Sequence, residues 1–188
     1  MDENVGEFFV GEPHIGRPDC SGRTDKEIAV YDMLDSLGVE YTVIDHDPAA
    51  SVDTCDEIER KLGVKICKNL FLCDRKKTRF FMLSMPGEKH FVTRDFSHAI
   101  ESPRLSFAPP EKMLEFLNIT PGSVSVLGLM NDSGNDVKYY IDSDLMKDEF
   151  FGCHPCINTS SLKIRMSDVL TKIIPATNHD YSVYTPTV

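Results

Sequence analysis

The chain has 188 residues, 41% of them hydrophobic, which is enough for one domain with a real core and short extensions. Its formal net charge of -10 argues against a protein that coats nucleic acid non-specifically, because such binding needs clustered Lys and Arg. No apolar run approaches the length of a membrane span and residues 1–4 do not resemble a signal peptide, so we expect no membrane association and a cytoplasmic location.

The first half of the chain predicts helices alternating with strands. Residues 1–22 are rich in Gly, Pro and charge without a hydrophobic period, which predicts an extended leader. Thr24 and Glu27 have the spacing of a capping box, and apolar residues at helical spacing follow as far as Gly38. Further elements are expected as a strand over 40–45, a helix over 54–62 with its own capping box, and a hairpin of strands 69–74 and 79–85 joined by the polar turn 75–78.

The second half predicts a similar mixture. The apolar run 124–129 is expected to be a buried strand that forms a hairpin with residues 137–141. Other elements are expected as helices over 93–100, 109–117 and 167–174, a helical turn over 142–146, and strands over 104–107 and 160–165. Residues 176–188 predict a C-terminal tail. The chain is therefore expected to form one mixed α/β domain over residues 23–175, between the leader and the tail.

The stretch from Gly152 to Ser160 and the pair Lys68-Asn69 are the most distinctive polar features. A glycine lets a loop approach a ligand with its backbone, a proline stiffens the chain, and Asn, Thr and Ser supply neutral hydrogen-bonding groups. Lys68 lies at the start of Asn69-Leu70-Phe71-Leu72, so a short apolar strand would hold its ammonium near a fixed place. We expect the two stretches to form opposite walls of one pocket.

Several other kinds of site find little support. The patterns of a serine-hydrolase elbow, a zinc protease, a P-loop and a dinucleotide-binding loop are all missing. Cys153 and Cys156 have C-x-x-C spacing, which leaves open a redox pair or half of a zinc site. However, a strand is expected after them where a redox motif would open a helix, and Cys67 and Cys73 have the wrong spacing for a second zinc knuckle. The six cysteines are therefore expected as reduced thiols, with no metal or other cofactor.

Single residues do not decide the function. A lone lysine such as Lys68 is by default a solvated surface residue. His154 is as easily a structural hydrogen-bonding residue as a functional one.

A family resemblance adds to this interpretation. It covers about residues 16–174 and is carried by five stretches: Gly22-Arg23-Thr24-Asp25-Lys26-Glu27, Cys67-Lys68-Asn69-Leu70-Phe71-Leu72, Arg104-Leu105-Ser106-Phe107, Thr120-Pro121-Gly122-Ser123-Val124 and Gly152-Cys153-His154-Pro155-Cys156-Ile157-Asn158-Thr159. Together these resemble the prolyl-tRNA editing family, the ProX and YbaK-like domains, and within it the freestanding alanyl-tRNA(Pro) deacylases. The Lys-Asn pair of that group is matched by Lys68 and Asn69, and its Gly-x-His-Pro loop by Gly152, His154 and Pro155.

The resemblance implies a fold, a reaction and a set of site residues. The fold would be α+β, a largely antiparallel, barrel-like sheet surrounded by helices. The reaction would be hydrolysis of the ester between a wrong amino acid and the terminal ribose of a transfer RNA, without a metal. Three residues would be catalytic, Lys68, Asn69 and His154, and four would bind substrate, Gly152, Pro155, Asn158 and Thr159. The partner would be the acceptor end of tRNA(Pro) carrying alanine, with prolyl-tRNA synthetase as a further candidate.

Editing would correct errors that arise because a synthetase pocket has limited selectivity between amino acids. A pocket built for proline rejects the smaller alanine weakly, since a methylene group is worth only roughly 1–3 kcal/mol. A second, smaller pocket would hydrolyse the wrong ester, and we expect His154 and Pro155 in its wall. Two alternatives remain open at this point: a cysteinyl-tRNA deacylase of the same fold, and a non-catalytic module that docks on a synthetase or a transfer RNA.

Overall fold

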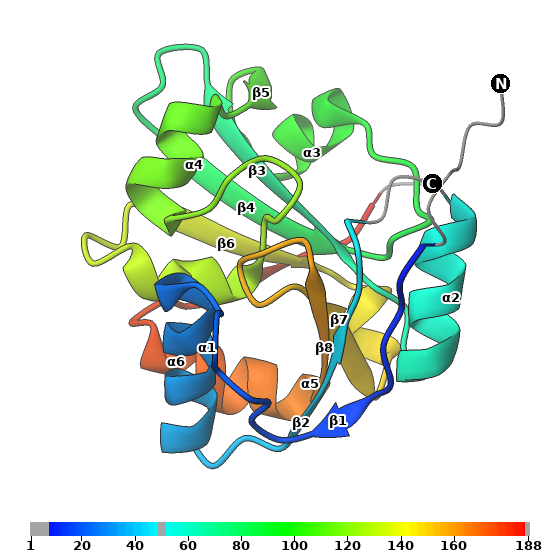
Figure 1. Cartoon of the computed structure of the whole chain (residues 1–188). Helices are drawn as coiled ribbons and strands as arrows, with labels where there is room; N and C mark the ends of the chain where they lie inside the picture. The colour runs from blue at the N-terminus through cyan, green and yellow to red at the C-terminus, as the bar shows by residue number, and fades with distance from the viewer. Residues whose placement is uncertain (1–7, 49–51, 187–188) are drawn as a thin grey trace, which may run out of the picture.

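Two β-sheets with helices around them make up the fold of this computed structural model, which describes residues 8–48 and 52–186 (Figure 1). The four-stranded sheet has the order β1 (His14–Ile15), β2 (Tyr41–Asp45), β8 (Ser160–Arg165) and β7 (Phe150–Cys153). The five-stranded sheet has the order β5 (Leu105–Phe107), β3 (Lys68–Asp74), β4 (Phe80–Met85), β6 (Val137–Asp142) and β9 (Tyr181–Tyr184). Residues 1–7 of the expected leader and residues 187–188 of the expected tail lie outside the described part.

The helices lie around these sheets (Figure 1). The main ones are α1 (Asp25–Ser36), α2 (Val52–Leu62), α3 (Thr93–Ala99) and α4 (Pro110–Leu117). Shorter segments are the 3-10 helices η1 (Val126–Asn131) and η2 (Leu145–Lys147), and a C-terminal run of α5 (Met166–Asp168), the π-helix η3 (Val169–Ile173) and α6 (Ile174–Ala176). No helix of the described ranges is long and apolar enough to span a bilayer.

Strand pairing confirms the expected fold class, a mixed α/β fold with largely antiparallel sheets. The hairpin of β3 and β4 forms around the expected turn, with Lys68 opposite Met85. β2 pairs antiparallel with β8, which in turn pairs antiparallel with β7. The exceptions are β6 and β9, because β6 runs parallel to both β4 and β9.

One short contact joins the two sheets beside the expected pocket. Ile66 forms an isolated parallel bridge with Gly152 of β7, and the Cys67 N–H donates to the Gly152 carbonyl at 2.9 Å. The chain then enters β3 at Lys68. This contact brings the start of β3 next to the loop that follows β7, so the two stretches singled out in the sequence are neighbours.

The prediction of a strand over residues 124–129 is wrong. The Ser125 hydroxyl accepts a hydrogen bond from the Leu127 N–H at 3.2 Å and caps η1, which spans most of that run. Gly128 inside η1 packs so tightly on Ile119 and Leu117 that an added Cβ would clash with them. A buried helical turn and a buried strand are both apolar throughout, so hydrophobicity alone did not separate them. The hairpin predicted with residues 137–141 is wrong for the same reason, since β6 pairs with β4 and β9 instead.

Other local predictions also need correction. The Thr24 side chain makes no capping hydrogen bond, and Glu27 is buried against Arg23 and Tyr31 instead of closing a capping box. The expected helix 167–174 is present but contains a π-helical segment, and Pro175 lies within α6 instead of after the helix. Strand β7 replaces part of the expected loop at Gly152, and the expected leader and tail contribute β1 and β9.

The core lies on both faces of the five-stranded sheet. Phe71 of β3 and Tyr139 of β6 belong to the main cluster, which also contains Leu162 of β8 and Tyr31 of α1. Leu72, the next residue of β3, belongs to a second cluster with Phe96 of α3. Successive side chains of a strand point to opposite faces, so β3 contributes to both clusters, and its first residues stand at the edge of both.

Candidate active site

A cavity of about 840 Å³ opens where α2, the chain entering β3 and the loop between β7 and β8 meet. Three of the seven residues that the sequence marks for the site line it: Lys68, His154 and Asn158. The expectation of one pocket between the two stretches therefore agrees with the geometry.

Charges of both signs line the cavity wall. The cations are Lys65 and Lys68, and the carboxylates are Asp56, Glu59 and Glu88. The Glu59 carboxylate already has partners within the protein. It accepts hydrogen bonds from the Lys65 ammonium at 2.6 Å and from the Ile66 N–H at 2.9 Å. Much of its charge is thus satisfied within the protein.

Lys68 is held at the edge of this cavity by a single described hydrogen bond. Its ammonium donates to the backbone carbonyl of Lys89 at 2.7 Å, and its own backbone is paired with Met85 in the sheet. An ammonium has three N–H donors, and among the described residues the other two have no protein acceptor. Lys68 is therefore a half-buried cation with donors left for a ligand.

Asn69 occupies the opposite side of β3 and does not line the cavity. Its side-chain carbonyl accepts a hydrogen bond from the Ser84 hydroxyl across the β3–β4 pair, and Ser84 accepts one from the buried Tyr139 hydroxyl at 3.0 Å. Its amide lies 3.5 Å from the Cys67 sulfur. The geometry makes Asn69 a support behind β3 in place of a second group beside Lys68.

His154 belongs to a chain of three polar side chains. Its Nδ1 lies 2.9 Å from the Ser160 carbonyl, which can only accept, so we assign the proton to Nδ1. The same Nδ1 lies 3.3 Å from the Ser161 hydroxyl, which lies 2.9 Å from Nε2 of His46. Nδ1 of His46 donates to the Asp47 carbonyl at 2.8 Å, so its Nε2 must accept from Ser161.

This assignment leaves Nε2 of His154 as a lone-pair acceptor with no partner among residues 8–48 and 52–186. Burial lowers the pKa of His154 from its ordinary value, the hydrogen bond to Ser160 opposes the shift, and nearby His46 adds to it. Burial also lowers the pKa of His46, against the effect of the Asp47 carbonyl and of Asp45. Both rings are therefore neutral at neutral pH, and His154 offers a base or hydrogen-bond acceptor to the cavity.

Gly152 acts in the framework and does not line the cavity. A Cβ added to it would overlap the Lys65 carbonyl oxygen and press on the Ile66 Cα. Only glycine permits this close approach, on which the bridge between the two sheets depends. The glycine thus positions Lys68 and His154 from behind.

The turn after His154 is made by two residues that are also buried. Pro155 is buried outside the cavity lining, and Cys156 adopts a positive φ of 63°. Burial raises the pKa of Cys156 to about 12 and that of Cys153 well above its ordinary value. Both are thus protonated thiols, which is the opposite of the low-pKa thiolate that a redox C-x-x-C motif uses.

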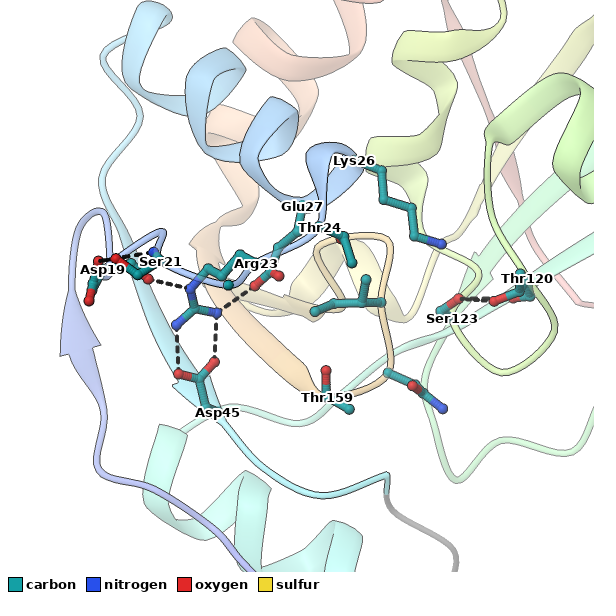
Figure 2. Close-up of a pocket in the computed structure, with 13 residues that line it drawn as sticks. Asp19, Ser21, Arg23, Thr24, Lys26, Glu27, Asp45, Thr120, Ser123 and Thr159 are labelled. Carbon is teal, nitrogen blue, oxygen red and sulfur yellow. Dashed lines mark hydrogen bonds and ion pairs between the residues drawn. The ribbon is translucent and has the colours of Figure 1, made fainter.

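A second cavity of about 500 Å³ lies beside the first and is drawn in Figure 2. Asn158 borders both cavities, whereas Thr159 borders only the second. Arg23 forms part of its wall and is neutralised there, because its guanidinium binds both oxygens of Asp45 at 2.9 and 2.7 Å and Glu27 at 2.5 Å. This wall is therefore rigid and polar.

His46 and Ser161 are the site residues that sequence reasoning missed. His46 follows the last residue of β2, and Ser161 lies in β8, where it pairs with Ile44. The two are 115 positions apart in the chain. The one hint was that polar residues follow the end of the strand predicted over 40–45 and begin the strand predicted over 160–165. Without knowledge that β2 pairs with β8, this hint predicts no contact.

The sequence of this chain is similar to a known protein family and to several individual proteins. Residues 46–172 match the model of the family described as the aminoacyl-tRNA editing domain. The prolyl-tRNA editing protein ProX of Acetoanaerobium sticklandii is 29% identical over 157 residues, which cover 84% of this chain and 95% of that protein. The prolyl-tRNA synthetase associated domain-containing protein 1 of Danio rerio is 27% identical over 150 residues, 79% of this chain and 80% of that one.

A solved structure shares the fold. The crystal structure described as a candidate trans-editing enzyme for prolyl tRNA synthetase has a TM-score of 0.62 and 16% sequence identity. The match covers 85% of this chain and 96% of the other.

Proposed function

The chain belongs to the aminoacyl-tRNA editing domain family, and from this premise we propose that it is a trans-editing hydrolase that removes alanine from mischarged alanyl-tRNA(Pro). The observation that carries the proposal is the meeting of the Lys68 ammonium and the neutral His154 ring in one cavity. The reaction is hydrolysis of the ester that joins the amino acid to the terminal ribose.

Lys68 is the electrostatic group in this proposal. Attack of water on the ester carbonyl places negative charge on the carbonyl oxygen, and a fixed ammonium with free N–H donors stabilises that charge as it forms. An aminoacyl ester is already activated, so no protein nucleophile is required. The buried thiols of Cys153 and Cys156, which are protonated, have no role in the step.

His154 contributes in two ways in this scheme, and both follow from its fixed ring. Its Nε2 lone pair accepts a hydrogen bond from the attacking water, from a ribose hydroxyl or from the amino group of the substrate. Its ring also fills space in the cavity, and we propose that this space is what the larger proline side chain would need. Asn158, at the border of the two cavities, is assigned to the substrate ribose, with Thr159 beyond it.

Asn69, Gly152 and Pro155 take supporting roles in this scheme. The hydrogen bonds of Asn69 run to Ser84 and Cys67 inside the fold, and Gly152 packs on the backbone of Lys65. These contacts fix the start of β3 and the His154 loop. We further propose that residues 23–175 form the editing domain, to which β1 and β9 of the flanking segments add edge strands, that prolyl-tRNA synthetase is a partner, and that the protein acts in the cytoplasm.

One assay tests this function against its alternatives. The purified protein is incubated separately with alanyl-, cysteinyl- and prolyl-tRNA(Pro), and the release of each amino acid is followed. Selective release of alanine supports the proposal, and selective release of cysteine makes the protein a cysteinyl-tRNA deacylase. Binding of tRNA(Pro) without release of any amino acid would instead identify a non-catalytic module.

A further inference from the structure

The carbonyl that receives the Lys68 ammonium belongs to Lys89, which lies outside the cavity in the loop after β4. The position of the Lys68 ammonium therefore depends on the position of this loop. Lys89 is four residues beyond Met85, the strand residue that pairs with Lys68. Both ends of the segment 85–89 therefore contact Lys68, Met85 through the sheet and Lys89 through its carbonyl.

The Lys89 side chain fastens the loop to β6. Its ammonium lies 2.8 Å from each oxygen of Asp142 and 2.7 Å from Asp144. The Asp142 side chain is fully buried, while Asp144 is 48% exposed and also binds Lys147. Burial acts to lower the pKa of Lys89, but its hydrogen bonds to Asp142 and Asp144 raise it above the ordinary value, so it stays charged.

Asp142 itself has a rigid position. It is the last residue of β6, and its backbone pairs with Tyr184 of β9. Its Oδ1 also accepts the Asp144 N–H at 2.8 Å. A buried carboxylate that loses its cation is strongly unfavourable, so any movement of Lys89 away from Asp142 is resisted.

We propose that Lys89 and Asp142 are positioning residues for ester hydrolysis, because the ion pair between the partly exposed Lys89 and the buried Asp142 fixes the carbonyl that aims the Lys68 ammonium into the cavity. The inference rests on the proposed function for the role of Lys68. It goes beyond it by assigning a task to an ion pair that does not touch the cavity. An ion pair that only stabilised the fold would affect the thermal melt and leave the orientation of Lys68 unchanged.

The test uses a double variant, Lys89→Met with Asp142→Asn, which removes the pair without leaving a buried charge unpaired. Asp144→Asn is the matched control, since it removes a carboxylate from the same lysine but keeps Asp142. Lys89→Arg is the conservative variant. For each protein, the single-turnover rate of alanine release from alanyl-tRNA(Pro) is measured over a series of enzyme concentrations. This series gives two separate quantities, the maximal rate and the enzyme concentration at which half of that rate is reached. A thermal melt of each protein is recorded as well.

We expect the maximal rate of the double variant to fall about 10- to 100-fold, as misplacement of a catalytic group by about 1 Å can do. The enzyme concentration that gives half the maximal rate should change little in the double variant. Asp144→Asn should keep nearly the full maximal rate, and Lys89→Arg should recover part of the loss. A full maximal rate in a folded double variant would overturn the proposal. The proposal would also be overturned if the only change were a higher enzyme concentration at half the maximal rate. If the double variant does not fold, Asp142→Asn, which still offers an acceptor to the Asp144 N–H, decides by the same criteria.

A second readout does not depend on the reaction. Trace acetylation followed by mass spectrometry measures the reactivity of Lys68 relative to Lys112, a lysine of α4 that pairs with Glu115. Release of Lys68 from its carbonyl should make it react faster in the double variant and not in Asp144→Asn. Unchanged reactivity of Lys68 in the double variant would overturn the positioning role. This outcome is distinct from failure of the proposed function, which would show as a wild-type protein that releases no amino acid.

Discussion

The rings of His46 and His154 lie 6.1 Å apart between centroids, and the hydroxyl of Ser161 stands between them within hydrogen-bonding distance of both. This arrangement fixes the His154 ring through Nδ1 and leaves its Nε2 without a partner among the described residues. Two features follow, a ring of defined shape in the cavity wall and a pair of buried neutral bases. Each supports a separate prediction.

His154→Ala should admit a larger amino acid. Removal of the ring enlarges the cavity at the place where we expect proline to be excluded, so hydrolysis of prolyl-tRNA(Pro) should rise relative to alanyl-tRNA(Pro). Release of both amino acids is measured side by side under single-turnover conditions. A variant that loses alanine release and gains none with proline would show that His154 is catalytic or structural and not part of a sieve.

Stability should fall as the pH drops below about 6.5, the ordinary histidine value. Burial lowers the pKa of both His46 and His154, so in this range the unfolded chain binds protons that the folded chain does not. The free energy of unfolding therefore decreases from about pH 6.5 down to the lowered values. Urea unfolding on either side of this pH measures the effect, and His154→Gln should flatten the curve; an equally steep curve in that variant would exclude His154 as a source.

Lys68→Ala should abolish most deacylation and leave the fold intact. The loss of one donor to a developing oxyanion costs on the order of a hundredfold or more in rate. Because the side chain is half-buried and makes one hydrogen bond to Lys89, stability should fall by only about 1 kcal/mol. Single-turnover rates and thermal melts are compared with those of Lys68→Arg, which we expect to recover little because a guanidinium is broad and planar. A near wild-type rate in Lys68→Ala would remove Lys68 from the mechanism.

Gly152→Ala should destabilise the protein, while Gly134→Ala serves as a matched control. In both cases an added methyl group meets an oxygen too closely, but at Gly152 that oxygen is the Lys65 backbone carbonyl, whereas at Gly134 it is the end of the flexible Asp136 side chain. We expect about 1–3 kcal/mol of lost stability for Gly152→Ala. For Gly134→Ala the change should be within about 0.5 kcal/mol. Equal losses in denaturant unfolding would contradict the assignment of Gly152 to the bridge between the sheets.

Treatment with a chelator should leave deacylation unchanged. Across residues 8–48 and 52–186, the structure shows no group of three or more His, Cys, Asp or Glu side chains suited to a metal ion. Lys68 carries the positive charge that a metal would otherwise supply. The rate of alanine release is measured before and after dialysis against EDTA, and a lasting loss that zinc restores would refute the prediction.

The sequence predicted those parts of the fold whose patterns are local. The helical spacing before Gly38 and the hairpin around residues 75–78 depend on neighbours in the chain, and α1 and the β3–β4 pair are found there. The run at 126–129 and the strand β9 could not be assigned locally, because one is buried on all sides and the other is defined by its parallel pairing with β6. Buried segments take their conformation from tertiary contacts that a single-chain pattern does not contain.

The candidate site shows the same division. Lys68 and His154 stand out because of unusual local sequence, and they line one cavity. Asn69 is next to Lys68 in sequence, yet the alternation of a strand directs it to the other face, where it binds Ser84. His46 and Lys89 act through contacts with distant residues, Ser161 and Asp142, so no local motif could have identified them.

The pairing of β2 with β8 has a consequence for the order in which this protein can acquire its structure. Tyr41 of β2 lies opposite Ile164, so this ladder closes a loop of more than one hundred residues. During synthesis the segment that contains His46 leaves the ribosome long before Ser161 has been added to the chain. The chain entropy lost on closing this long loop is therefore lost only late, when β8 pairs with β2. Until then the edge of β2 has no β8 beside it and the acceptor nitrogen of His46 has no hydroxyl to bind. We therefore expect the nascent chain to remain without a working site until β8 has emerged.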